Sequence, residues 1–331
     1  MKKHWSVLIY CCGLAAASIG ISINSSGVFY TPVSKSLHIL RGTFSMHMTL
    51  FSLATAIISL FVPKIYQKFS FKKILTFSVI IAVVSTAAMA LGKNAITFYI
   101  LGAIRGMSTS LFSIVPITMI INGWFEKKHG LATSIAFGFS GLGGTLCSPV
   151  LSSVISSFNW QMGYLLKAVI LLLLCLPAVL YPFSMNAKDE GLLPYGYQEK
   201  HETTQNQATS SFHFMSISFI AFFIFGMLIS CITSVTQHLP GYGESLGFPL
   251  TSCAILLSAG MMGNIVSKLI IGSLSDHFGE MKATLMMISV NILGIDLLII
   301  GRSMTLLIVG AFLFGSCYSL GAVAVPLLTK Y

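Results

Sequence analysis

Ten long apolar stretches recur along the chain, and they constrain its fold more than any other feature of the sequence. Each holds about the 20 residues that a helix needs to cross the hydrocarbon core of a bilayer. They cover residues 5–29, 44–66, 72–92, 94–121, 129–155, 161–183, 211–235, 249–275, 281–301 and 303–328. The stretches are too long and too uniformly apolar for the strands of a closed barrel, the other structure that can span a membrane. The sequence therefore predicts an all-α membrane protein with ten spans.

Composition supports the same fold class. Of the 331 residues, 55% are hydrophobic and only 8% are charged, whereas a soluble domain carries roughly a quarter of its residues as Asp, Glu, Lys or Arg. So few charges could not cover a surface that faces water. The formal net charge of +10 does not indicate a nucleic-acid partner, because the basic residues are scattered between apolar stretches and form no basic face.

The chain lacks the patterns of enzymes and metal sites. Its seven cysteines all fall inside apolar stretches, without a CxxC motif or a Cys/His cluster, and they are expected to be small apolar packing residues. The GxSxG, HExxH and P-loop patterns do not occur. The sequence therefore predicts neither catalysis nor a metal or cofactor.

The amino-terminal stretch MKKHWSVLIYCCGLAAASIG has the basic, apolar and small-residue regions of a signal peptide. Its apolar character continues through Ile23, and similar stretches follow. A retained first helix is the favoured interpretation.

The positions of the basic residues predict the orientation of the spans. With the amino terminus inside, twelve lysines are cytoplasmic and four basic residues are external, which is a strong positive-inside bias. The twelve are Lys2, Lys3, Lys64, Lys68, Lys72, Lys73, Lys127, Lys128, Lys188, Lys200, Lys282 and Lys330, and the four are Lys35, Arg41, Lys93 and Arg302. We expect both termini to be cytoplasmic, in a multi-pass protein of the cell membrane.

One long polar segment divides the chain. Residues 186–211 are rich in Pro, Gly, Gln and Thr and carry mixed charge, which is typical of a flexible linker. The sequence thus predicts a six-helix bundle over residues 1–185, a cytoplasmic linker over 186–211, and a four-helix bundle over 212–331.

Two polar motifs lie at matching places in these halves. PKIYQKFSFKK (residues 63–73) follows the second span, and GSLSDHFGEMK (residues 272–282) follows the second span after the linker. A motif that recurs in this way indicates an internal repeat, which is common in secondary transporters.

The second motif resembles the signature loop of the major facilitator superfamily, and the first is a degenerate copy. Gly272, Asp276, Gly279 and Lys282 are kept in the second copy; Lys68, Lys72 and Lys73 are kept in the first, where Pro63, Gln67 and Ser70 stand in place of the glycine, the aspartate and the second glycine. Arg105-Gly106 in the fourth span is similar to the arginine motif of that superfamily.

Two further stretches resemble the oxalate:formate antiporter and monocarboxylate transporter branch. They are WFEKKHGLATSIAFGFSGLGG (residues 124–144) and EGLLPYG (residues 190–196). The resemblance implies a fold of two helical bundles that transports a small organic anion by alternating access, in most members as a monomer. It also implies twelve spans, six in each half, so the chain is expected to be truncated after the tenth. The alternative is a protein that manages with ten.

The resemblance implies a gate at the signature loop. Asp276 would face the positive amino-terminal end of the fifth span, near His129, and this contact would hold the two halves together while the inner side is closed. Gln67, Lys68 and Lys72 occupy the matching loop. An ordinary solvated loop is the alternative.

Charged groups inside a span are costly, and they are therefore candidate functional residues. Arg105, about ten residues into the fourth span, could bind an anion or hold helices together. The resemblance places a cationic residue that contacts the substrate carboxylate at Lys268, which could instead snorkel to the interface. Asn24 and Tyr30 give the first span polar groups for the same cavity.

Other polar and small residues within the spans have alternative interpretations. Asp296 could carry a proton if burial raised its pKa, or it could pair with Arg302. Lys167 is interpreted as an interfacial anchor, and the glycines near residues 138–144 as a helix-packing face. The leading hypothesis is a transporter of a mono- or dicarboxylate, with the antiport that the resemblance implies. The alternative is a non-transporting remnant or a sensor with the same fold.

Overall fold

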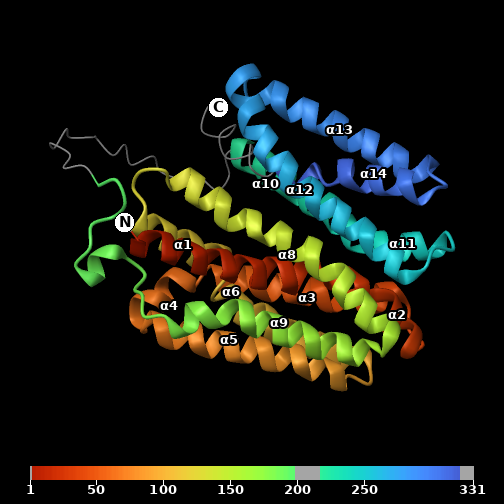
Figure 1. Ribbon diagram of the computed structural model, residues 1–331, viewed down its shortest axis with the longest axis horizontal. Helices are drawn as coiled ribbons and strands as arrows, with labels where there is room; N and C mark the ends of the chain where they lie inside the picture. The colour runs from red at the N-terminus through yellow and green to blue at the C-terminus, as the bar shows by residue number, and fades with distance from the viewer. Residues whose placement is uncertain (1, 198–216, 321–331) are drawn as a thin grey trace.

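The computed structural model describes residues 2–197 and 217–320. Helices make up nearly all of its secondary structure, and the described residues contain one isolated β-bridge, between Phe125 and Tyr195. The long helices lie side by side along the longest axis of the molecule (Figure 1). They form two bundles, α1–α9 in red to green and α10–α14 in green to blue.

The first bundle contains six membrane-crossing segments, several of them broken. Its elements are α1 (Lys2–Ala15), the π-helical η1 (Ala16–Asn24), η2 (Ser26–Phe29), α2 (Tyr30–Ser36), α3 (Arg41–Ser59), α4 (Val62–Lys68), α5 (Phe71–Ala88), η3 (Met89–Leu91), α6 (Ala95–Ser110), α7 (Ile114–Trp124), α8 (His129–Ser157) and α9 (Trp160–Leu180). A short turn, η4 (Ala187–Glu190), follows it.

The described part of the second bundle begins at Ile217. Its elements are α10 (Ile217–Val235), η5 (Thr236–His238), α11 (Leu239–Ser245), α12 (Leu250–Phe278), α13 (Glu280–Ile300) and α14 (Met304–Phe314).

The predicted apolar stretches coincide with these helices wherever the structure describes them. Within the described residues, eight helices are long and apolar enough to cross a membrane, or nine if the bent pair α3 and α4 counts as one span; Met304–Leu320 is a shorter apolar helix. The 54° bend between α3 and α4 has a local cause, because Pro63 in the first turn of α4 lacks the N–H that would continue the preceding helix. The first crossing extends to Ser36, beyond the predicted residue 29.

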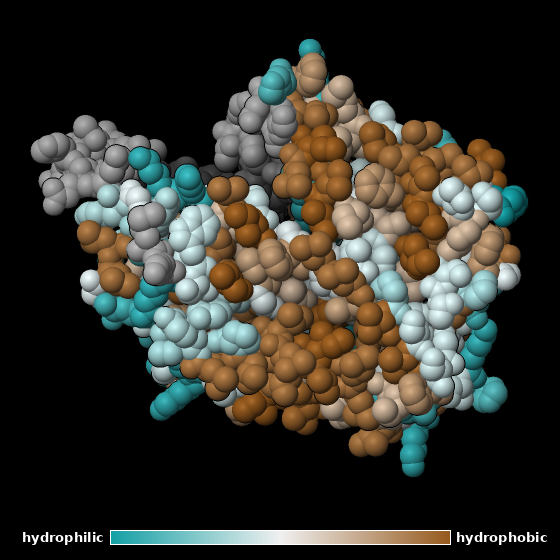
Figure 2. Space-filling view, viewed as in Figure 1, coloured by the Kyte–Doolittle hydropathy of each residue, from teal (hydrophilic) through white to brown (hydrophobic). Residues whose placement is uncertain are grey.

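The surface has the distribution of polarity that a bilayer requires. Figure 2 shows hydrophobic side chains over the middle of the visible face, while the hydrophilic ones gather toward the two ends. Large apolar side chains such as Leu173 and Ile299 are well exposed on the helices. The protein is therefore a multi-pass membrane protein.

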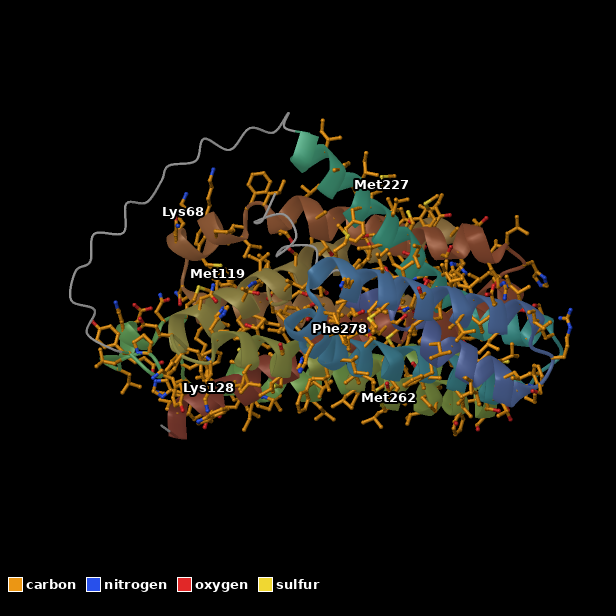
Figure 3. The ribbon with its side chains drawn as sticks, turned by 90° about the horizontal axis from the view of Figure 1, so that it is seen from above. Lys68, Met119, Lys128, Met227, Met262 and Phe278 are labelled. Atoms are coloured by element: carbon orange, nitrogen blue, oxygen red, sulfur yellow. The ribbon has the colours of Figure 1, made fainter. Side chains whose placement is uncertain are left out.

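The two ends of the molecule are named here by their position relative to the start of α1. We call the end at which α1 starts the amino-terminal end, and the other the distal end. The loops after α4 and α7 lie at the amino-terminal end, and Figure 3 shows Lys68 and Lys128 at that same end, on opposite sides of the molecule. The loop between α11 and α12 lies at the distal end.

Close packing of α8 joins the two bundles. A Cβ atom on Gly141 would lie 2.4 Å from Cγ1 of Ile265 on α12, and one on Gly143 would lie 3.3 Å from Cα of Gly20 on η1. Small residues therefore let α8 approach both helices, as the sequence suggested. Gly138 differs from them, because nothing lies within 4 Å of its Cβ position.

The first part of the predicted linker is packed rather than free. Nε1 of Trp124 donates a hydrogen bond to the Ser184 carbonyl at 2.9 Å, and N of Tyr195 donates to the Trp124 carbonyl at 2.8 Å. Lys3 forms an ion pair with Glu190. The prediction of a flexible linker is thus wrong for residues 186–197, because buried aromatic and backbone groups hold them against the first bundle. Residues 198–211 lie outside the described chain.

Candidate functional site

A cavity of about 440 Å³ lies between the two bundles. Its described lining comes from helices of both: Ile19, Asn24, Ile114, Thr133, Ser134, Phe137, Gly138, Ser140 and Gly141 from the first bundle, and Asn264, Ile265, Lys268, Leu269 and Tyr318 from the second. Cavities of this size and mixed polarity between helices are common sites for small ligands. The structure thus brings two predicted site residues, Asn24 and Lys268, to the same cavity.

Lys268 is the only charged side chain among the described residues that line this cavity. It is half-buried, and neither of the two ion pairs in the described chain involves it. A cation in apolar surroundings is costly unless an opposite charge or hydrogen-bond acceptors replace its lost hydration. The cavity therefore favours a negatively charged ligand.

The uncharged polar groups of the cavity differ in how far they are already bonded. Nδ2 of Asn24 donates to the Ser140 carbonyl at 3.2 Å, and the Tyr318 hydroxyl donates to the Thr233 carbonyl at 3.2 Å. Oδ1 of Asn264 and Oγ1 of Thr133 are buried and have no hydrogen-bond partner in the structure. The unpaired oxygens of Asn264 and Thr133 are thus enclosed by the surrounding protein in this conformation.

The distal side of this cavity is sealed by contacts between the bundles. N of Gly27 donates to Oε1 of Gln237 at 3.0 Å, and Oγ of Ser258 donates to the Thr145 carbonyl at 2.8 Å. Farther out, Oγ of Ser152 bonds the Leu250 carbonyl at 3.2 Å, and Lys35 and Glu244 form an ion pair across the interface.

The opposite side of the cavity is open. Leu269, on its amino-terminal rim, is 68% exposed, and Ser134 across from it is exposed as well. The hydrogen bonds that join Gly27 to Gln237, Thr145 to Ser258, Ser152 to Leu250 and Lys35 to Glu244 all lie on the distal side. The conformation is therefore open toward the amino-terminal end and closed toward the distal end.

Arg105 is buried inside the first bundle and does not line the cavity. Its Nε donates to Oγ1 of Thr86 at 3.1 Å, its Nη2 to the Ser22 carbonyl at 3.2 Å, and its Nη1 approaches Sδ of Met89 at 3.4 Å. These contacts join α6 to α5, η3 and η1. The sequence left two roles open for Arg105, which were to bind an anion or to hold helices together. This conformation favours the second role.

The interpretation of Lys167 as an interfacial anchor is wrong. Its side chain is 0% exposed, and its Nζ donates to Oγ of Ser26 at 2.9 Å and lies 5.2 Å from the centre of the Phe29 ring. Oγ of Ser26 donates in turn to the Ser22 carbonyl at 2.9 Å, the same oxygen that Arg105 contacts. Two buried cations therefore converge on the irregular part of the first crossing, where the usual helical hydrogen-bond pattern changes.

Tyr30 is buried on the distal side of the molecule. Its ring packs against Phe44 of α3 and, at a centroid distance of 5.2 Å, against His238 of the second bundle. It is absent from the cavity lining given above. In this conformation it belongs to the contact that closes the distal side.

The signature-loop residues lie at the amino-terminal end. Helix α12 ends at Phe278, and Gly279 has a φ of +83°, a backbone conformation that glycine adopts without strain. Lys282 is exposed. The surroundings of Gly272 and the side chain of Asp276 lie outside what the structure describes, so the latch against the start of α8 stays a prediction.

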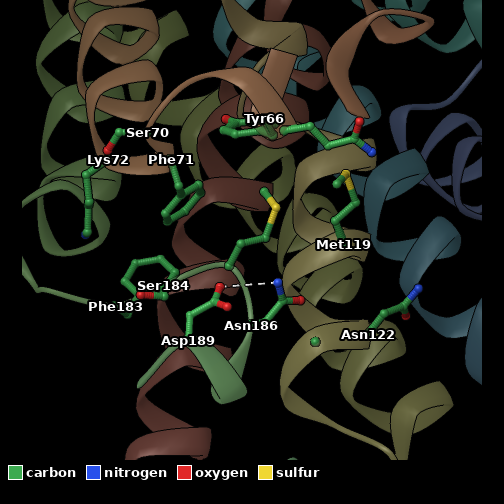
Figure 4. A pocket seen from close by; sticks show the side chains of 13 residues that line it. Tyr66, Ser70, Phe71, Lys72, Met119, Asn122, Phe183, Ser184, Asn186 and Asp189 are labelled. Atoms are coloured by element: carbon green, nitrogen blue, oxygen red, sulfur yellow. Dashed lines mark hydrogen bonds between the residues drawn. The ribbon is translucent and has the colours of Figure 1, made fainter. Parts of the chain in front are cut away.

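The degenerate first copy of the loop borders a different cavity, of about 750 Å³, at the amino-terminal end of the first bundle (Figure 4). Gln67 and Lys72 are among its lining residues, and Lys68 is exposed beside it. Lys72 donates to the Ala178 carbonyl at 2.7 Å and also to the Tyr181 carbonyl. It therefore caps the carboxyl end of α9 and compensates its dipole, which is a structural role.

Asp296 lies on the exposed side of α13, and no ion pair of the described chain joins it to Arg302. The proposed proton carrier needed burial, so this position does not support that role. Among the described residues, no group of three or more His, Cys, Asp or Glu side chains could hold a metal ion.

Two bundles of membrane-crossing helices surround a ligand-sized cavity that is sealed on its distal side, which is an arrangement typical of membrane transporters. Comparison with known families agrees with this class. The chain belongs to the Major Facilitator Superfamily, whose family model matches residues 11–330. This is a family of transporters and not of enzymes.

Individual relatives are distant. The chain is 26% identical over 183 residues to the MFS-type transporter YcxA of Bacillus subtilis (strain 168), an alignment that covers 54% of this chain and 44% of that protein. It is 21% identical over 199 residues to the probable transporter MCH2 of Saccharomyces cerevisiae, covering 59% of this chain and 40% of that one. The alignments thus span less than half the length of these relatives.

Solved structures share the fold. The nucleoside transporter NupG superposes with a TM-score of 0.73 over 100% of this chain and 82% of its own, at 16% identity. At this identity the likeness shows the fold alone.

Proposed function

We propose that this chain is a secondary transporter that binds a small organic anion, a mono- or dicarboxylate, in the cavity between its bundles. The observation that carries the proposal is Lys268, the sole charge among the described lining residues, without an acidic partner in the described chain. In the cavity, the Lys268 ammonium group and the carboxylate of the ligand each lose water of hydration, and the ion pair between them compensates for that loss. The ammonium group of a lysine acts as a point charge and accepts carboxylates of varied geometry.

Transport would follow from an exchange of the open and closed sides. Separation of Gly27 from Gln237 and of Ser258 from Thr145 would open the distal side, while the amino-terminal rim closed around the ligand. Arg105 and Tyr30 would support this change without contact with the ligand, since both lie away from the cavity. Asn24 would orient the ligand from the first bundle.

The single cation also favours antiport. An empty carrier that closed both sides of the cavity would trap Lys268 without a counter-charge, at a cost of several kcal/mol. A second anion bound for the return step removes that cost. We therefore propose exchange of one anion for another, by a monomer.

The orientation with both termini in the cytoplasm is part of the proposal. Lys64, Lys68, Lys127 and Lys128 are exposed at the amino-terminal end, as the positive-inside bias requires of the cytoplasmic side. The open side of the cavity is then the cytoplasmic one. Labelling of a cysteine placed at Lys128 in intact cells tests this: reaction with a membrane-impermeant maleimide before lysis would refute the orientation.

Ligand-dependent stabilisation of the purified protein tests the binding site. Short-chain mono- and dicarboxylates should raise the melting temperature of the unchanged chain, and Lys268→Gln should abolish this effect. Lys93→Gln is the matched control, because Lys93 is exposed in a loop far from the cavity. Equal stabilisation of the unchanged chain and the Lys268 variant would refute the assignment of Lys268.

Counterflow of a radiolabelled carboxylate into proteoliposomes tests transport itself. Uptake that depends on unlabelled carboxylate inside, and that Lys268→Gln removes, supports antiport. Binding without any flux would instead support the alternative, a protein that kept the fold as a sensor or remnant.

A further inference from the structure

A groove of about 810 Å³ lies on the outer surface of the first bundle, apart from the cavity between the bundles. We call it the lysine groove. It is formed by the end of α4 and the first half of α5, and its lining residues are Lys68, Phe69, Ser70, Lys72, Lys73, Ile74, Thr76, Phe77 and Ile80. Three of these residues are lysines and none is acidic, so the groove is positively charged.

Two of the three lysines are available to a ligand. Lys72 already donates to the carbonyl groups that end α9. Lys68 and Lys73 are exposed, and neither of the two ion pairs in the described chain involves them. Lys64, one turn before Lys68 on α4, is exposed as well and adds to the same positive field. The groove therefore attracts an anionic group.

A second hollow, of about 260 Å³, adjoins the groove at Phe77, which lines both. We call it the apolar cleft, and its lining residues are Ile58, Ile65, Phe77, Ser78, Ile81, Ile104, Met107, Ser108 and Leu111. Its two serines donate hydrogen bonds to carbonyl groups of their own helices, at 2.9 Å in each case. The cleft thus offers apolar contacts to a ligand.

The apolar cleft lies at the bend between α3 and α4. Ile58 precedes this 54° bend and Ile65 follows it, while the opposite wall comes from α5 and α6. A bent segment cannot stay in contact with a straight neighbour along its whole length, so a hollow remains between them. The chain therefore carries a permanent apolar recess on its membrane-facing surface.

The groove and the cleft follow each other in depth. Along the axis of α5, Phe77 lies about 6 Å and Ile81 about 12 Å beyond Lys73, at the helical rise. Lys68 marks the polar end of the molecule (Figure 3), so the lysines lie at the water boundary and the cleft lies within the apolar layer. A phospholipid has its charge and its acyl chains in the same order, whereas a small soluble anion would use the lysines alone.

We propose that one anionic phospholipid binds at this place, with its phosphate group against Lys68 and Lys73 and one acyl chain in the apolar cleft. Basic pockets at the ends of membrane helices suit such headgroups. The acyl chain would fill the hollow at the bend and join α3 and α4 to α5 and α6, and would thus stabilise the first bundle. This site is independent of the proposed function, because it involves neither Lys268 nor a transported ligand.

Thermal stabilisation of the purified full-length chain in detergent, titrated with lipid, tests the proposal. The probes are dioleoylphosphatidylglycerol, which is anionic, dioleoylphosphatidylcholine, which has the same acyl chains and no net charge, and inorganic phosphate. Each lysine near an anionic headgroup contributes about fivefold in affinity. Lys68→Gln combined with Lys73→Gln should therefore weaken the binding of phosphatidylglycerol about 25-fold and leave that of phosphatidylcholine unchanged.

Lys127→Gln combined with Lys128→Gln is the matched control for charge. It removes two exposed lysines at the same end of the molecule, and Figure 3 shows Lys128 on the side opposite Lys68. This pair should keep the affinity for phosphatidylglycerol. A loss as large as that of the groove variant would show attraction to the whole basic surface and would overturn the site.

Ile81→Trp tests the acyl chain, because the larger side chain fills the apolar cleft. It should cause a loss of affinity for phosphatidylglycerol that Val84→Trp does not cause, since Val84 is 60% exposed on the same helix and does not line the cleft. Equal affinities in these two variants would overturn the place of the chain.

Two results with the unchanged chain decide the proposal without any variant. Equal stabilisation by phosphatidylglycerol and phosphatidylcholine would overturn the role of the lysines. Stabilisation by inorganic phosphate as strong as that by phosphatidylglycerol would identify a site for a soluble anion and overturn the lipid.

Discussion

Gly27 offers the sharpest test of the closed distal side. Its N donates to the side chain of Gln237, and a Cβ atom added to it would lie 2.2 Å from the Gln237 carbonyl oxygen. Since ordinary contact begins near 3.4 Å, the backbone of η5 must retreat by about 1.2 Å to accommodate Gly27→Ala. The contact is between bundles, so this retreat separates them without disturbing the core of either.

The magnitude follows from two terms. Loss of the hydrogen bond costs about 1 kcal/mol, and overpacking of a tight contact costs about 1–3 kcal/mol. Together they disfavour the distally closed conformation by about 2–4 kcal/mol, which changes its equilibrium constant about 30-fold to 1,000-fold. Gly27→Ala should therefore populate the distally open conformation. The variant should unfold at a temperature close to that of the unchanged chain.

Thiol accessibility measures this shift. Ser152→Cys places a thiol in the buried distal seal, in a Cys231→Ser background because the Cys231 thiol is exposed. A membrane-impermeant maleimide added from the distal side should label it slowly, and much faster in combination with Gly27→Ala. Gly42→Ala is the matched control, since nothing lies within 4 Å of its Cβ position. An unchanged labelling rate in the Gly27 variant would refute the seal.

Three further predictions concern charged residues. Arg105→Ala should lower the free energy of unfolding by about 2–4 kcal/mol in a denaturant titration, because it leaves a cavity and unpaired acceptors; Arg105→Lys, without the forked guanidinium, should not restore it. Lys167→Met should change the free energy of unfolding by no more than about 1 kcal/mol, because removal of a buried charge offsets the lost hydrogen bond to Ser26. A loss as large as that of Arg105→Ala would contradict this. A double-mutant cycle for Lys35 and Glu244 should give less than about 1 kcal/mol, falling further in salt, because Lys35 is largely exposed.

Features that depend on local composition could be predicted from the sequence. The apolar stretches match the observed helices because hydrophobic length is a property of consecutive residues. The bend before α4 has a local cause in Pro63. Lys268 and Asn24 could also be proposed as site residues, because a polar group inside an apolar stretch stands out without any knowledge of its neighbours.

Features that depend on the face of a helix on which a residue lies could not be predicted from the sequence. Lys167 and Asp296 both interrupt apolar stretches, yet Lys167 is buried against Ser26 while Asp296 is exposed. The depth of a residue along a span can be counted, but the face on which it lies is decided by packing against other helices. Asn264 lies one turn from Lys268 in the sequence, but only the folded structure shows that its side-chain oxygen is buried without a hydrogen-bond partner.

By itself, the sequence determined that this chain crosses a membrane many times, resembles a transporter family and carries few charges within its spans. The tertiary structure decided which of those charges reach the cavity, how two buried cations hold the irregular first crossing, and which side of the cavity is sealed. The physical reason is that contacts between bundles join residues more than a hundred positions apart, such as Thr145 and Ser258. No local pattern specifies such contacts, because they exist only when both bundles are folded and packed against each other.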